Sequence, residues 1–181
     1  MSKAVGPVLP TWSVMSPKRR EHVQRVVSLL ARWASIMKLS DVETTAWIDA
    51  GNWHDALRDA DEPRLREMTG DLQRPFGMLH GPAAALRLYE EGELRNDVIE
   101  AIRWHTIGSV EWTRTGRALY MADFLEPGRG FMQTDRRFLA ERVPEAFDEV
   151  FRQVVRVRIE WALREGKGLA PETIALWNAV R

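Results

Sequence analysis

Four histidines and two aspartates stand out in this sequence because they lie among apolar residues. The histidines fall in the segments REHVQRV, GNWHDAL, GMLHGPA and AIRWHTI, and one aspartate lies within LYMADFLEP. Burial of such polar groups costs free energy unless they are paired or bound to a metal. Imidazole nitrogens and carboxylate oxygens also bind first-row transition metals. These residues could converge on one metal site, and they are His22, His54, Asp55, His80, His105 and Asp123.

Each of these residues, taken alone, has a simpler explanation. A single histidine on an apolar helix face is more often a hydrogen-bonded core residue than a metal ligand. Asp123 could pair with Arg117 or another arginine, and Asp55 could cap a helix or pair with Arg58. His105 could lie at a helix C-terminus, where the helix dipole favours a positive charge. The set as a whole is therefore more informative than its members.

The composition narrows the class of protein. A chain of 181 residues with 45% hydrophobic and 29% charged residues fits one soluble domain. The formal net charge of +0 gives no basic field for nucleic acid, so no nucleic-acid partner is expected. The absence of cysteine excludes disulfides and thiolate metal sites. The N-terminal segment contains Pro7 and Pro10 and no long apolar stretch, so we expect neither a signal peptide nor a membrane anchor, and a cytoplasmic protein.

The elements that must position the candidate ligands are predicted to be helices. Ser16 and Ser40 are typical N-caps, and apolar residues follow at three- and four-residue steps. Residues 1–16 are predicted to be irregular, and no alternating strand pattern is found. The sequence predicts one all-α domain, a bundle of seven or more helices. The expected helices span residues 16–39, 40–57, 63–69, 81–92, 96–105, 112–126, about 144–165 and 170–180.

Two further groups of residues are expected to be structural. The tryptophans at helical spacing are predicted to lie in the core, and they are Trp33, Trp47, Trp161 and Trp177. The arginines of RQVVRVR are predicted to form a solvated face, and they are Arg152, Arg156 and Arg158.

The order His, His-Asp, His, His, Asp uses every histidine of the chain and resembles the signature of the HD-domain superfamily of metal-dependent phosphohydrolases. The blocks EHVQRVVSLLARWA, HDALRD, MLHGPAAA, AIRWHTIG and ALYMADFLEPGRGF resemble one branch more closely. That branch is the YqeK family of symmetrical bis(5'-nucleosyl)-tetraphosphatases, which cleave diadenosine tetraphosphate into two ADP. The resemblance implies an HD-type domain over residues 17–181.

The resemblance also implies two metal ions. The ligands of the first ion would be His22, His54, Asp55 and Asp123. The second ion would share Asp55 and add His80 and His105. A hydroxide bridging the ions would attack phosphorus. The resemblance implies that His54, Asp55 and Arg58 are the catalytic residues. Iron or manganese is favoured for ligands of nitrogen and oxygen, and cobalt, nickel or zinc is possible.

Four residues are implied to contact the substrate. Arg58 and Arg129 would bind phosphate oxygens, since a guanidinium matches phosphate geometry. Thr106 and Gly108 would lie against the nucleotide, where glycine permits a close approach of the backbone. The sequence departs from the family at Arg58, where a lysine is usual, and this change bears on substrate choice.

Several alternatives remain open at this stage. The chain could be another HD-domain nucleotidase or phosphodiesterase, or an HD domain that binds a nucleotide or a protein without hydrolysis. It could also be a helical bundle with merely buried histidines. The expected partner is a dinucleoside polyphosphate or another nucleotide, no membrane partner is expected, and a homodimer is possible.

Overall fold

A computed structural model of the protein describes residues 8–181, and within this range the chain forms nine α-helices, one short 3-10 helix and no strand. The predicted all-α class is confirmed. Residues 8–16 are irregular, as expected, and residues 1–7 of that segment lie outside the described part. The elements are α1 (Pro17–Ile36), α2 (Asp41–Trp53), α3 (Glu62–Thr69), η1 (Phe76–Met78), α4 (His80–Glu90), α5 (Asn96–Trp104), α6 (Arg114–Leu125), α7 (Gln133–Arg142), α8 (Phe147–Arg164) and α9 (Pro171–Val180).

Local capping explains where the first helices begin. The Ser16 hydroxyl accepts a hydrogen bond from the backbone N–H of Arg19, and Pro17 is the first residue of α1. Ser40 caps α2 in the same way through the N–H of Glu43. The end of α2 differs from the prediction, because the helix stops at Trp53 instead of continuing to residue 57. Residues 54–60 instead form successive turns, which place the His-Asp pair at the end of the helix.

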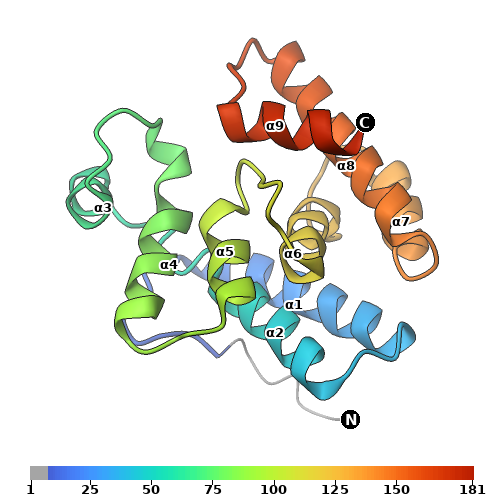
Figure 1. Cartoon of the computed structure of the whole chain (residues 1–181), viewed down its shortest axis with the longest axis horizontal. Coiled ribbons are helices and arrows are strands. Elements are labelled where there is room, and N and C mark those ends of the chain that lie inside the picture. The colour runs from blue at the N-terminus through green and yellow to red at the C-terminus, as the bar shows by residue number, and fades with distance from the viewer. Residues whose placement is uncertain (1–7) are drawn as a thin grey trace.

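One helix was not predicted, and another begins later than expected. Residues 133–142 form α7, although only Phe138, Leu139 and Ala140 give this charged segment an apolar patch. The predicted helix from about residue 144 begins at Phe147. The segment containing Pro144 joins α7 to α8, and these two helices lie side by side in Figure 1.

The centre of the molecule is α6, which contacts α1, α2, α5, α7 and α8 (Figure 1). Nearly every residue of α6 from Thr115 to Leu125 is buried, as expected for a helix surrounded by other helices. Trp33 and Trp47 are fully buried, and Trp177 packs against the core, which confirms their predicted places. The prediction for Trp161 was wrong, since its residue is 46% exposed near the end of α8. Among residues 8–181, no helix combines the length and the apolar character that crossing a membrane requires.

Candidate metal centre

The six candidate ligands meet inside the helical bundle, and each is at most 8% exposed. His22 lies in α1 and Asp123 in α6. His54 and Asp55 follow the last residue of α2, His80 begins α4, and His105 follows α5. Gly81 permits this convergence, because a Cβ atom there would lie 2.8 Å from the carbonyl oxygen of Ile102 and 3.2 Å from the ring of His105.

The ligands form two groups of three, and within each group the ligand atoms lie within 4.8 Å of one another. One group contains His22, His54 and Asp123, and the other contains Asp55, His80 and His105. The carboxylate of Asp55 lies between the groups. Its Oδ1 is 3.1 Å from Nε2 of His80 and 3.5 Å from Nε2 of His105. Its Oδ2 is 3.8 Å from Nε2 of His22 and 3.6 Å from Nε2 of His54, so each oxygen faces one group.

Hydrogen bonds on the outer side of two rings fix how these histidines point. The Nδ1 of His54 donates to the carbonyl of Gly51 at 2.8 Å, and the Nδ1 of His105 donates to that of Ile102 at 2.7 Å. A carbonyl can only accept, so in each neutral ring the lone pair is on Nε2, which faces the centre. Within the described residues, the buried Nε2 of His54 has no hydrogen-bond partner, and Nε2 of His22 lies 3.1 Å from Oδ1 of Asp123. This donor arrangement fits metal binding, in which a second contact orients each ligand.

The pKa values of the two histidines of the first group, His22 and His54, shift in opposite directions. Burial lowers the pKa of His54 to about 4, so this ring is neutral at pH 7. Burial also opposes a charge on His22, but the carboxylates of Asp123 and Glu126 outweigh it and raise the pKa of His22 to about 9. His22 therefore holds a second proton at neutral pH, and metal binding must displace that proton.

The two aspartates are held ionised, although both are buried. Burial alone would raise the pKa of Asp55, but the surrounding histidines, His54 first among them, lower it well below its usual value. For Asp123 burial is again opposed, here mainly by the guanidinium of Arg129, and its pKa also lies well below the ordinary value. Two carboxylates thus remain negative in the centre, which favours a cation beside them.

Three arginines contact these aspartates. Nη1 of Arg19 lies 2.7 Å from Oδ2 of Asp55, and Nη2 of Arg129 lies 2.6 Å from Oδ1 of Asp123. Nη1 of Arg158 lies 3.6 Å from Oδ2 of Asp123. The predicted solvated face was therefore wrong for Arg158, which is partly buried. Neither Arg19 nor Arg158 was predicted from the sequence to be a partner of the site.

Each aspartate pairs with an arginine, as Asp123 was expected to do if it had no metal, but the partners are not Arg117 and Arg58. Arg117 lies 3.2 Å from Asp148 instead of pairing with Asp123. Asp55 pairs with Arg19 and not with Arg58, for which no ion pair is found in the part of the chain that the structure describes. Arg58 is partly exposed, and its charge lowers the pKa of the nearby His80 to a small degree, after burial and His105.

The two other predicted substrate residues lie beside His105. The Oγ1 of Thr106 is 3.3 Å from Nε2 of His105, and this residue is partly buried. Gly108 has a φ of +94°, and a Cβ atom there would lie 2.5 Å from the side chain of Leu176 in α9. The structure therefore gives Gly108 a conformational and packing reason to be glycine, and its contact with a nucleotide stays a prediction.

Glu126 supports the centre, and the sequence reasoning missed it. Its carboxylate is only 1% exposed and accepts hydrogen bonds from Nε of Arg25 and the N–H of Gly128, both at 2.6 Å. It also lies 3.1 Å from Nδ1 of His22. Its position in the sequence could have indicated this role, because Glu126 lies between the apolar end of α6 and Pro127. Burial of a carboxylate there costs free energy unless it has partners.

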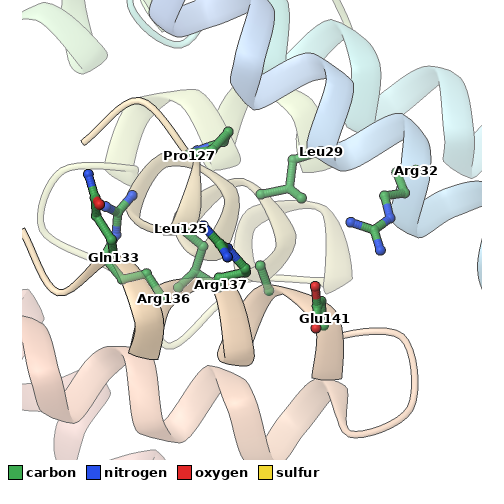
Figure 2. A pocket seen from close by; sticks show the side chains of 9 residues that line it. Leu29, Arg32, Leu125, Pro127, Gln133, Arg136, Arg137 and Glu141 are labelled. Carbon is green, nitrogen blue, oxygen red and sulfur yellow. The ribbon is translucent and has the colours of Figure 1, made fainter. Parts of the chain in front are cut away.

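Arg136 holds the segment that follows α6. This side chain from α7 is 2% exposed and donates to the carbonyls of Phe124, Glu126, Arg129 and Phe131. It lines a cavity of about 260 Å³ between α1, the end of α6 and α7, together with the neighbouring Arg137 (Figure 2). Arg136 thereby fixes the backbone that carries both Glu126 and Arg129.

A larger cavity of about 540 Å³ opens at His22. Four cationic side chains line it, and they are Lys18, Arg19, Arg25 and Arg129. Asp59 and Glu126 are its acidic residues. The excess of positive charge next to a buried cluster of histidines and aspartates suits an anionic ligand.

No family model matches the chain, but three curated bacterial proteins are similar to it. Each is named symmetrical bis(5'-nucleosyl)-tetraphosphatase. The protein of Staphylococcus aureus is 32% identical over 120 residues, which are 62% of this chain and 60% of that protein, so the match spans less than two thirds of its length. The protein of Halalkalibacterium halodurans is 25% identical over 91% of this chain and 92% of its own. That of Bacillus subtilis is 24% identical over 71% and 73%, respectively.

A crystal structure from Clostridium acetobutylicum shares the fold. That protein is described as a predicted HD superfamily hydrolase involved in NAD metabolism. It superimposes with a TM-score of 0.78 at 23% identity and covers 92% of this chain and 90% of its own. The resemblance expected from the sequence is therefore confirmed: the chain has the fold of an HD superfamily hydrolase and is similar in sequence to the symmetrical bis(5'-nucleosyl)-tetraphosphatases.

Proposed function

We propose that this protein is a metal-dependent hydrolase that cleaves dinucleoside tetraphosphates symmetrically, so that diadenosine tetraphosphate yields two ADP. The position of Asp55 carries the proposal, because one carboxylate oxygen faces each group of candidate ligands. A carboxylate in this position can serve two metal ions at once. The names of the three relatives supply the substrate.

The proposed ligands are those that the sequence predicted. His22, His54 and Asp123 would hold one ion, His80 and His105 the other, and Asp55 would contact both. When bound, two such ions neutralise phosphate charge and lower the pKa of a water molecule, whose hydroxide is the proposed nucleophile. Nitrogen and oxygen ligands without sulfur suit iron or manganese, and also cobalt, nickel or zinc.

The side chains around the centre would bind and orient the polyphosphate. Arg19 and Arg129 each hold a ligand carboxylate and line the cavity at His22, so their remaining N–H groups are available to phosphate oxygens. Arg58, without an ion-pair partner in residues 8–181, is the third proposed phosphate contact. Positioning supplies much of the rate in phosphoryl transfer, which makes these contacts catalytically relevant.

The cut is proposed to fall between the two central phosphates, which leaves ADP on each side. An ADP leaving group carries its charge on phosphate oxygens and needs little protonation, so no strong general acid is required at this site. His54 fits this view, since its pKa of about 4 leaves it neutral at pH 7 as a ligand and not as a proton donor.

Chromatography of the products from diadenosine tetraphosphate tests the proposal. The metal-loaded protein should give ADP as the sole nucleotide product, and Asp55→Asn, which removes the shared charge, should be inactive under the same conditions. A mixture of ATP and AMP would overturn the symmetrical cut. Absence of turnover together with rapid hydrolysis of mononucleotides would instead assign the chain to another HD-domain activity.

A further inference from the structure

Another cavity, of about 220 Å³, lies beside the exposed Trp161. It is formed by the loop between α5 and α6, the second half of α8 and the segment that leads into α9. Figure 1 shows α8 and α9 packed over this loop. The residues that matter here are Met78, Thr106, Arg158, Trp161, Lys167 and Leu169.

Two residues of the cavity wall reach the metal ligands directly. Thr106 Oγ1 lies 3.3 Å from Nε2 of His105. Arg158 lies 3.6 Å from Asp123 and donates a hydrogen bond of 3.1 Å to the carbonyl of Thr106. A ligand in this cavity would therefore have one end beside the metal centre.

The rest of the wall has a different character. Met78, Trp161 and Leu169 are apolar, and the ammonium of Lys167 lies 3.9 Å from the centroid of the Trp161 ring. Trp161 is 46% exposed near the end of α8 and lines this cavity, so its ring is accessible to a ligand there. The cavity is smaller than the roughly 300–1,000 Å³ of a site that encloses a whole drug-sized ligand, so it suits one end of a longer molecule.

We propose that this cavity binds the nucleobase of the substrate half whose phosphates lie on the metal centre, with Trp161 as the aromatic surface against which the base packs. The inference rests on the proposed function, and it adds the site that recognises the nucleoside. A base is flat and apolar on its faces, which suits the apolar part of this wall. Its sugar joins it to phosphates, which would then lie beside Arg158 and Asp123.

The two cavities differ in the part of the substrate that their side chains suit. The cavity at His22 is lined by four cations and suits phosphates, whereas the cavity at Trp161 has an apolar wall. A substrate anchored by its base at Trp161 would extend its phosphate chain across Asp123 toward Arg19 and Arg129. This direction places a phosphate chain, and not a sugar, over the six ligands.

Calorimetric titration of the metal-loaded protein with ADP and with inorganic pyrophosphate tests the inference. Trp161→Ala should weaken ADP binding roughly 5- to 150-fold, the range that base–aromatic stacking energies imply. It should leave pyrophosphate binding unchanged, because pyrophosphate has no base. Trp161→Phe should restore most of the ADP affinity. Tyr89→Ala is the matched control, since Tyr89 is an aromatic residue of α4 that is 59% exposed and lines no part of the cavity.

The outcomes separate this inference from the proposed function. If the wild-type protein cleaves diadenosine tetraphosphate and Trp161→Ala binds ADP as the wild type does, the base site is refuted and the activity stands. If the wild type neither cleaves diadenosine tetraphosphate nor binds ADP, the proposed function is refuted, and the base site that rests on it is refuted as well. A Trp161→Ala protein that keeps its ADP affinity but changes its elution volume would assign the exposed ring to contact between two copies of the chain, which also overturns the inference.

Discussion

Replacement of Arg136 by methionine should destabilise the protein far more than the same change at its neighbour Arg137. Both arginines lie in α7 and line the same cavity, but Arg136 is buried and Arg137 is exposed. Methionine approximates the volume of the arginine stem and removes every hydrogen bond of the guanidinium. Comparison of the two variants therefore measures the loss of the hydrogen bonds of Arg136. The change in helix propensity from arginine to methionine is small and is the same in both variants.

The expected magnitude follows from the acceptors of Arg136. Its guanidinium serves four backbone carbonyls, and its bonds to Phe124 and Glu126 are fully buried. A buried carbonyl left without a donor costs about 1–3 kcal/mol. Part of that cost is offset, because the variant no longer buries a charge, and burial is what lowers the pKa of Arg136. We expect a net loss of about 2–5 kcal/mol in the free energy of unfolding.

Urea denaturation followed by circular dichroism measures this difference. Arg137→Met should lie within about 0.5 kcal/mol of the wild type, as is usual for an exposed position. Arg136→Lys should fall between the wild type and Arg136→Met, since an ammonium can still donate to some of the carbonyls. Equal midpoints for Arg136→Met and Arg137→Met would refute the reasoning that these four bonds hold the segment after α6.

Three further outcomes follow from the metal centre. Asp55→Asn should lose most of its bound metal while the helical circular dichroism persists, and full metal content measured by elemental analysis would contradict a shared carboxylate. Because the pKa of His22 is raised to about 9, metal binding at pH 7 should release about one proton, and metal affinity should rise with pH up to about pH 9. Calorimetry in buffers of different ionisation enthalpy measures the number of protons released. Metal binding without proton release would count against His22 as a ligand. Arg129→Ala should keep its metal but raise KM for diadenosine tetraphosphate several-fold, and an unchanged KM would exclude the phosphate contact.

The sequence predicted the all-α class and the candidate ligands because both depend on local patterns. Buried helix faces repeat at three and four residues, and a histidine or aspartate inside such a face is conspicuous. The convergence of His22 and Asp123, which are far apart in the chain, could be expected from the family resemblance but not from periodicity. Helix α7 escaped prediction because its stability comes from Arg136 and its contacts with α6, and not from an apolar stripe.

The contacts of the supporting residues could not be predicted for a related reason. Arginine and glutamate are usually solvated, so nothing in RQVVRVR distinguishes Arg158, which lies near Asp123, from the exposed Arg156. Glu126 is buried only because Arg25 and His22 of another helix face it. Trp161 was placed in the core by its spacing, although the face it occupies on α8 is left partly uncovered. Such partnerships are tertiary, and a one-dimensional pattern does not contain them.

All six candidate ligands lie between residues 22 and 123, so the last three helices contribute none. Bound ions would therefore oppose the local opening of α1 and α4–α6 and of the turn after α2, but would not directly oppose the detachment of α8 and α9. Amide hydrogens of these two C-terminal helices could exchange with solvent while the metals remain in place. Apart from Arg158, which lies near Asp123, α8 and α9 can thus vary in sequence and in local stability, and so change which substrate binds, while the six ligands stay in place.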